Sequence, residues 1–240
     1  MAHYSDFLLM LIVLLGLALL GASRVAGSIR IVAFQGVTLG VLLLSYTDDI
    51  SGRLVALALV NIALKGFLMP WLLFRAVREA KIQREVQPYI GFMLSLVLGA
   101  VAIGIAFAIG HVLPLPNASV SPLVVPVSLA TVFIGLLLMV SRRMAITQVV
   151  GYLVMENGIF VFSLTLAANL PAIVEMGVLL DVFVGVFIMG ITIFQINREF
   201  DHMDASRLRE LQDTAGGHRR RWPFGLRHQR IGGRENIGRG

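Results

Sequence analysis

The chain has 240 residues, of which 57% are hydrophobic and 14% charged, and its mean hydropathy is +0.84. This composition excludes a water-soluble domain of such length and predicts an integral membrane protein. The absence of cysteine excludes thiolate-bound iron–sulfur clusters, cysteine-bound zinc, disulfides and a thiol nucleophile in this chain. The net charge is +6, but ten of the twenty Lys and Arg residues follow Asn197, so the positive charge is concentrated in one terminal segment.

Apolar runs of about 20 residues, the length that crosses a bilayer as a helix, occur seven times along the chain. They cover residues 6–23, 28–46, 53–75, 88–112, 122–140, 145–168 and 171–196. Inside lipid these runs must be helical, because open strands would leave backbone groups without hydrogen bonds. No basic residue precedes the first run and further runs follow it, so we interpret it as a retained helix and not as a signal peptide. The sequence therefore predicts an all-α, polytopic membrane protein with seven transmembrane helices.

The connections between these runs alternate in charge. Basic residues lie in the first, third and fifth connections, namely Arg24, Arg30, Arg75, Arg78, Lys81, Arg84, Arg142 and Arg143. The second connection carries Asp48 and Asp49 with only Arg53, while the fourth and sixth have no Lys or Arg. By the positive-inside rule, the N-terminus is expected outside and the C-terminus in the cytoplasm.

Three parts are predicted along the chain. Residues 1–112 form an N-terminal four-helix membrane part, residues 122–197 form a three-helix module, and residues 198–240 form a basic cytoplasmic tail that is largely disordered. The run from His218 to Trp222 has the composition of a segment that contacts nucleic acid or an acidic partner. A tail held at anionic lipid headgroups is the simpler explanation. We therefore expect membrane lipid, and no nucleic acid, as its partner.

Three ionisable side chains, Lys65, Glu156 and Asp181, lie near the centres of predicted spans. A charge at that depth costs at least about 2.5 kcal/mol, which makes each of them a candidate functional residue. The two spans that carry the acids are joined by a short turn, so they are predicted to be antiparallel neighbours with the carboxyl groups at similar depth. We interpret Glu156 and Asp181 as a proton relay, with Lys65 modulating it or linking it to the next subunit.

Other polar residues are possible accessories to this relay: Asn157, Glu175, Asn61 and Thr38. Asn61 and Pro70 flank Lys65 and predict a locally opened helix there. A structural alternative stays open, in which Glu156 and Asn157 only hydrogen-bond across helices and Lys65 snorkels toward one membrane face. His111 has no second histidine at ligand spacing, so no metal or haem site is expected on this chain.

The three C-terminal spans resemble subunit K of NADH:quinone oxidoreductase and its relative in multisubunit cation/proton antiporters. The residues that carry the resemblance are Arg142, Arg143, Gly151 and Asn157, followed by Asp181 with Gly185 on the last span. One position departs from the family's motif. The first acid is expected at Leu153, whereas this chain has its carboxylate three residues later, at Glu156, about one helical turn along the same face.

With four more helices before this module and its Met-Glu-Asn-Gly signature at residues 155–158, the chain resembles hydrogenase-4 component E. That resemblance implies a non-catalytic subunit in the inner membrane of a bacterial cell, within a group 4 [NiFe] hydrogenase complex of the formate hydrogenlyase type. Antiporter-like subunits would be its neighbours, and the nickel–iron centre and iron–sulfur clusters would lie in partner chains. Two alternatives stay open: a subunit of a cation/proton antiporter without a redox partner, and a non-pumping spacer between antiporter-like subunits.

Overall fold

The computed structural model describes residues 2–45, 52–79, 90–113 and 121–164, together with residues 177, 179–180, 182–188 and 190. The regular elements are α1 (Ala2–Leu20), α2 (Val25–Ser45), α3 (Gly52–Asn61), the π-helix η1 (Ile62–Leu68), α4 (Met69–Glu79), α5 (Phe92–Val112), α6 (Val124–Ser141) and α7 (Ala145–Ser163). Every regular element in these ranges is a helix, as predicted. Contacts divide the chain into Met1–Ile196 and Asn197–Gly240, and the described residues lie in the first unit.

Within the described ranges, five helices are long and apolar enough to cross a membrane: Val25–Ser45, Val55–Arg78, Phe92–Val112, Val124–Ser141 and Ala145–Ser163. They correspond to the second through sixth predicted spans, which are thus confirmed as apolar helices of spanning length. The first predicted span is a shorter apolar helix, Tyr4–Leu20. Its predicted end near residue 23 is wrong, because backbone bonds from Gly21 and Ala22 to Leu17 and Leu19 close the helix earlier. The seventh predicted span lies mostly outside the described residues, so the count of seven stays a prediction.

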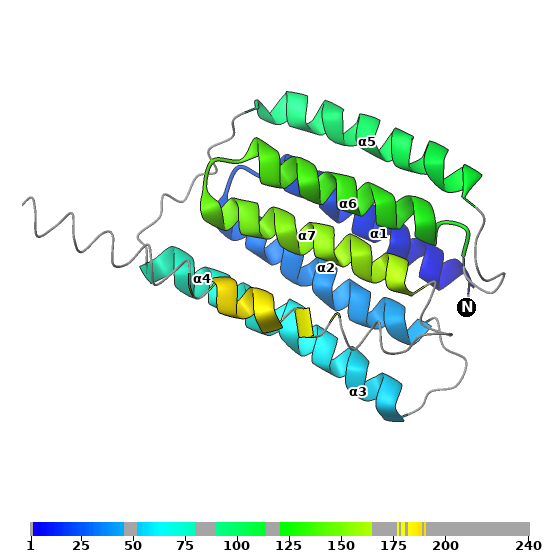
Figure 1. Ribbon diagram of the computed structural model, residues 1–240, viewed down its shortest axis with the longest axis horizontal. Helices are drawn as coiled ribbons and strands as arrows, with labels where there is room; N and C mark the ends of the chain where they lie inside the picture. Colours follow the sequence, from blue (N-terminus) through cyan, green and yellow to red (C-terminus); the bar gives the residue numbers. More distant parts are fainter. Residues whose placement is uncertain are drawn as a thin grey trace, which may run out of the picture. The chain divides into compact units, whose positions relative to one another are not determined.

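The elements α3, η1 and α4 follow one another as a single continuous helix, and this helix and the helices before and after it run in alternating directions (Figure 1). At one end of the bundle, the hydroxyl of Ser121 donates a hydrogen bond of 2.5 Å to the carboxylate of Asp6, joining the start of α1 to the start of α6. At the other end, Arg142 Nη2 donates to the carbonyl of Leu20 at 2.6 Å, joining the α6–α7 turn to the end of α1. This course places the basic connections around Arg24 and Arg142 at one end, as the charge alternation predicts. Which end is cytoplasmic stays a prediction.

Helix α2 lies at the centre of the packing. It contacts α1, α3, η1, α4 and α7, while α6 packs against α7, α5 and α1. Two apolar clusters fill the interior, one around Leu19, Met69 and Leu153 and the other around Leu9, Leu42 and Val161. Helix α5 lies at the edge of the bundle in Figure 1, and most of its apolar side chains are exposed. Such a surface is suited to lipid or to a neighbouring membrane helix, which is equally apolar.

Glycines bring the central helices unusually close together. A Cβ atom added at Gly135 of α6 would lie 2.6 Å from the Cα of Met155 on α7, and one added at Gly158 would lie 2.7 Å from the backbone nitrogen of Val132. Small residues at such contacts allow backbones to approach and gain dispersion energy, which is the main attraction available between helices in lipid. The tight α6–α7 pair therefore depends on its glycines.

The helix that carries Lys65 changes form in its middle. Between α3 and α4 the chain forms the seven-residue π-helix η1, and at its end the N–H of Met69 donates to the carbonyl of Leu64, five residues earlier. Pro70 follows directly and has no N–H to continue the regular α-helical pattern. The sequence predicted an opening of the helix at this place, and the structure shows it as a wider π-helical turn. Such turns inside membrane helices occur frequently at functional sites.

The glycine contact between α6 and α7 yields a stability prediction. Gly135→Ala is expected to destabilise the chain by about 1–3 kcal/mol, because the new Cβ meets backbone atoms of Met155 that cannot rotate away. Gly104→Ala on α5 is the matched control, since nothing lies within 4 Å of its Cβ position and alanine favours the helix. Thermal unfolding in detergent measures both. Equal melting temperatures for the two variants would contradict the close packing.

Candidate functional site: a buried ammonium–carboxylate network

The site centres on two charged side chains that are far apart in sequence. Lys65, in the middle of η1, and Glu156, in the middle of α7, lie with Nζ and Oε1 3.2 Å apart. Their residues are 4% and 3% exposed, so the ion pair is inside the bundle. The geometry combines a charge-assisted hydrogen bond with direct ionic attraction. The structure therefore brings together two of the three predicted mid-membrane charges.

A chain of amide groups continues from this pair toward α1. Lys65 Nζ also donates to Asn157 Oδ1 at 3.2 Å, and Asn157 Nδ2 donates to Gln35 Oε1 at 3.1 Å. Gln35 Nε2 in turn donates to the backbone carbonyl of Ile12 at 3.2 Å. The amide oxygen of Asn157 therefore faces the Lys65 ammonium, because the amide nitrogen donates to Gln35. Four elements, η1, α7, α2 and α1, are thus joined by one polar path through an apolar interior.

The surroundings of the ammonium favour a positive charge. Besides the two oxygen acceptors, Lys65 Nζ lies 5.3 Å from the centre of the Phe160 ring, within the range of a cation–π interaction. Removing two charges from water costs several kcal/mol per ion, and a buried pair recovers this only with good geometry and additional hydrogen bonds. Asn157 and Phe160 supply such contacts to the ammonium. The carboxylate is less completely satisfied, since Glu156 Oε2 is buried without a hydrogen-bond partner among the described residues.

Of the predicted accessory residues, Asn157 belongs to this network and Thr38 does not. The hydroxyl of Thr38 donates to the carbonyl of Phe34, one turn earlier on its own helix, at 2.9 Å. Asn61 is 1% exposed, and neither atom of its amide has a hydrogen-bond partner among the described residues. The alternative in which Lys65 snorkels toward a membrane face is wrong, because its ammonium is buried against Glu156.

Two predicted acids, Asp181 and Glu175, lie outside the described residues. The expected proximity of Asp181 to Glu156 therefore stays a prediction. Helical positions around it are described, and Val184 and Ile188 belong to the same apolar cluster as Leu153 of α7 and Met69 of α4.

The sequence analysis did not identify Gln35 as part of the site. Gln35 is fully buried and is the one amide that connects Asn157 to α1. A signal was present, since Gln35 is a hydrogen-bonding side chain near the centre of an apolar span, where such a group needs a partner. Its partner could not be read from the sequence, because 122 positions separate Gln35 from Asn157.

Arg142 is a second polar residue whose structural role the sequence did not reveal. It is 1% exposed, caps the end of α1 through Leu20, and places its guanidinium 5.0 Å from the centre of the Phe92 ring of α5. Desolvation lowers the pKa of the Arg142 guanidinium, although a guanidinium remains charged at neutral pH. Through these contacts Arg142 holds the turn between α6 and α7 against α1 and α5. This turn lies at the N-terminal end of α7, and Ser163 lies at its other end.

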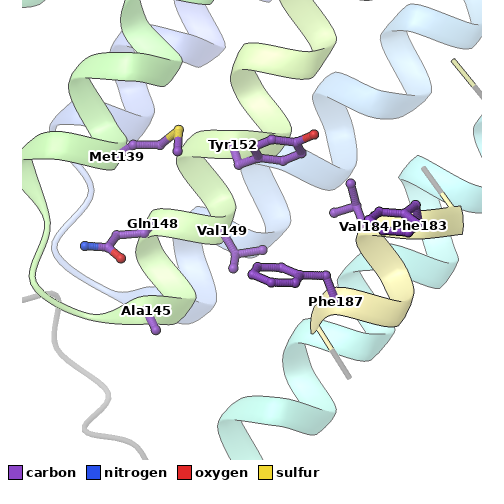
Figure 2. Close-up of a pocket in the computed structure, with 8 residues that line it drawn as sticks. All are labelled: Met139, Ala145, Gln148, Val149, Tyr152, Phe183, Val184 and Phe187. Carbon is purple, nitrogen blue, oxygen red and sulfur yellow. The ribbon is translucent and has the colours of Figure 1, made fainter. Parts of the chain in front are cut away.

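A cavity of about 380 Å³ lies beside α7. Figure 2 shows α6 and α7 on one side of it and the segment with Phe183, Val184 and Phe187 on the other. Its remaining lining residues are Met139, Ala145, Gln148, Val149 and Tyr152. The cavity is largely apolar, and neither Lys65 nor Glu156 is among its described lining residues. Within the described part of the chain, no cluster of His, Cys, Asp and Glu side chains is arranged to hold a metal ion.

The helices, their apolar surfaces and the buried ion pair define a polytopic α-helical membrane protein with a charged site inside the bundle. The chain is 36% identical over 187 residues to the uncharacterized protein Rv0085 of Mycobacterium tuberculosis, an alignment that covers 77% of this chain and 85% of that protein. The chain belongs to the same family as this mycobacterial protein.

More distant relatives carry a functional name. Hydrogenase-4 component E of Escherichia coli strain K12 is 27% identical over 148 residues, covering 62% of this chain and 68% of that protein. The component E of Shigella flexneri has the same identity and coverage. No protein-family model and no solved structure match the chain. The resemblance to hydrogenase-4 component E that the sequence suggested is thus present as a distant relationship.

The ion pair yields a prediction about how its two charges contribute to the stability of the chain. Lys65→Met is expected to destabilise the chain by about 3–5 kcal/mol, because it leaves the Glu156 carboxylate buried without its counter-charge. The double variant Lys65→Met with Glu156→Leu is expected to recover most of this loss, since neither charge remains.

Thermal unfolding in detergent measures the single and double variants. Thr38→Val is the control for loss of a buried polar group outside the network. A double variant that is as unstable as the sum of the two single variants would show that the two side chains do not interact.

Proposed function

We propose that this chain is a membrane subunit of a hydrogenase-type, complex-I-like assembly in the bacterial inner membrane, where it takes part in proton or sodium translocation. The observation that carries the proposal is the Lys65–Glu156 pair, buried at the middle of two helices of spanning length. Charged residues at this depth are costly and are found mainly where ions or protons move. The distant relationship to hydrogenase-4 component E supports the class of assembly.

The geometry suggests how a proton would be handled. While Glu156 is ionised, the ammonium of Lys65 balances it across 3.2 Å. When Glu156 takes up a proton, the ionic attraction across this pair is lost, while the oxygen of Asn157 and the ring of Phe160 still contact Lys65. Each protonation step therefore changes the force on Lys65, which is held by a π-helical turn and not by a regular α-helix. A charge change at Glu156 is in this way converted into a local change in η1.

A second carboxylate is proposed to share this role. Asp181 lies on the span that follows α7 in sequence, at the position where the subunit K motif has its second acid. Glu156 and Asp181 would pass the proton between them, with Glu175 nearer the predicted outer surface as an accessory. We propose further that the chain carries no catalysis of its own, and that nickel–iron and iron–sulfur centres belong to partner subunits.

One observation favours a second candidate, a spacer without ion transport. The path from Lys65 through Asn157 and Gln35 to Ile12 joins four elements, as expected for polar side chains that hold a bundle together. In that case the acids would stabilise the docking of antiporter-like subunits. A cation/proton antiporter without redox partners is the other assembly in which the same subunit would fit.

Removal of the carboxylates in the assembled complex separates these functions. Glu156→Gln and Asp181→Asn keep the size of each side chain and remove its charge. Each is expected to lower ion translocation by about a hundredfold, the scale on which a positioned proton-transfer group contributes. Thr38→Val, which removes a buried hydroxyl bonded only to its own helix, is expected to leave translocation unchanged.

The measurement is acidification of inverted membrane vesicles, followed with a pH-sensitive dye and driven by the electron transfer of the complex. Assembly is checked in parallel by the subunits that copurify in mild detergent. Normal assembly with unchanged translocation in both carboxylate variants would rule out the relay and favour the spacer. Copurification with antiporter subunits alone, without a [NiFe] large subunit, would rule out the hydrogenase-type assembly.

A further inference from the structure

Asn61 is a buried amide that the charged network does not use. It is the last residue of α3, it is 1% exposed, and both its Oδ1 and its Nδ2 lack a hydrogen-bond partner among the described residues. Two other amides that are buried in the described part of the chain behave differently, since Gln35 and Asn157 are each bonded through oxygen and nitrogen. Asn61 therefore stands out from the chemically identical groups around it.

The position of Asn61 places it next to the ion pair. It precedes Lys65 by four residues, about one turn of helix, so both side chains are on the same face and both are buried. Long side chains on a helix lean toward its N-terminus, which directs the Lys65 side chain toward the turn of Asn61. Helix α7 runs opposite to this helix in Figure 1, and its Phe160 ring, one turn beyond Glu156, lies 5.3 Å from Lys65 Nζ.

A buried amide left without partners is costly. Each unsatisfied polar group loses its hydrogen bonds to water without gaining a replacement, so such groups in proteins normally bind an ordered water molecule or an ion. Here both the donor and the acceptor of Asn61 lack partners, so the missing group must both accept and donate. Water does this, whereas a metal cation would satisfy only the oxygen and would be repelled by the ammonium of Lys65.

We propose that Asn61 binds ordered water inside the bundle, beside the Lys65–Glu156 pair. Glu156 Oε2, which is also buried without a partner among the described residues, is the second contact point for internal water. The ion pair is closed to bulk solvent. In this proposal water lies on one side at Glu156 Oε2 and on the other at Asn61, one turn before Lys65. The binding of water follows from the unpaired atoms alone, and its use in moving protons rests on the function proposed above.

Water-edited solid-state NMR on the full chain in lipid bilayers tests the site directly, because magnetisation passes from water only to nearby protons. The side-chain amide of Asn61, assigned through the loss of its signal in Asn61→Leu, is expected to receive magnetisation rapidly. The amide of Gln35, which is fully buried and bonded to Ile12, is the internal control and is expected to receive it slowly. Equally slow transfer to Asn61 and Gln35 would overturn the proposal.

Thermal unfolding gives a second readout that needs no signal from the amide. If water satisfies Asn61, replacement by leucine in Asn61→Leu removes hydrogen bonds already made, and the melting temperature stays the same or falls. A clear rise in melting temperature would mean that the native amide is unsatisfied, and would overturn the proposal. Asn157→Leu, which breaks the hydrogen bonds to Lys65 and Gln35, is expected to lower the melting temperature.

Ion translocation by Asn61→Leu in the assembled complex separates the two proposals. Rapid water transfer to Asn61 together with a translocation rate that falls in this variant supports both. Rapid transfer with unchanged translocation in Asn61→Leu, Glu156→Gln and Asp181→Asn would keep the water site and reject the relay.

Discussion

The burial of one ammonium with one carboxylate constrains the rest of this bundle. Neither Lys65 nor Glu156 could be placed in a lipid-embedded interior alone, so the helices that carry them must meet at one depth and in one orientation. Asn157 adds a second acceptor for the ammonium, and Gln35 fixes the direction of that acceptor. The apolar contacts around these residues constrain the positions of the helices less strongly, because one apolar side chain packs about as well as another of similar size.

Features of the backbone direct the Lys65 ammonium toward its partners, Glu156 and Asn157. Helix α2 approaches η1 so closely that a Cβ atom at Gly36 would lie 2.6 Å from the Cβ of Lys65, and a Cβ atom at Gly40 would overlap with the side chain of Ile62. These two glycines, four residues apart, form the small-residue pattern that lets membrane helices touch through their backbones. Together with the π-helical turn that ends before Pro70, they determine the direction in which the Lys65 side chain leaves its helix.

Much of this architecture could be predicted from the sequence, and the limits have a physical origin. The second through sixth spans followed from apolar length, and the irregularity near Lys65 followed from Asn61 and Pro70, because these are local properties. The pairing of Lys65 with Glu156 did not follow, since 91 positions separate them and a helix facing lipid is as apolar as one facing protein. Arg142 was interpreted as a topological charge and as part of the family motif, but its contact with Leu20 did not follow, because that contact depends on how α1 and α6 pack.

The pairing of Lys65 with Glu156 gives a physical reason for the position of the carboxylate on α7. The subunit K motif expects the acid at Leu153, which in this structure is 3% exposed and belongs to the apolar cluster with Met69 and Ile188. Three residues later, about 4.5 Å along the axis, Glu156 lies opposite Lys65. Glu156 is therefore at the depth where the N-terminal helices supply a counter-charge, whereas Leu153 is packed among apolar side chains. Lys65 and Gln35 come from the first half of the chain and Glu156 and Asn157 from the second, so the charged site depends on helices from both halves.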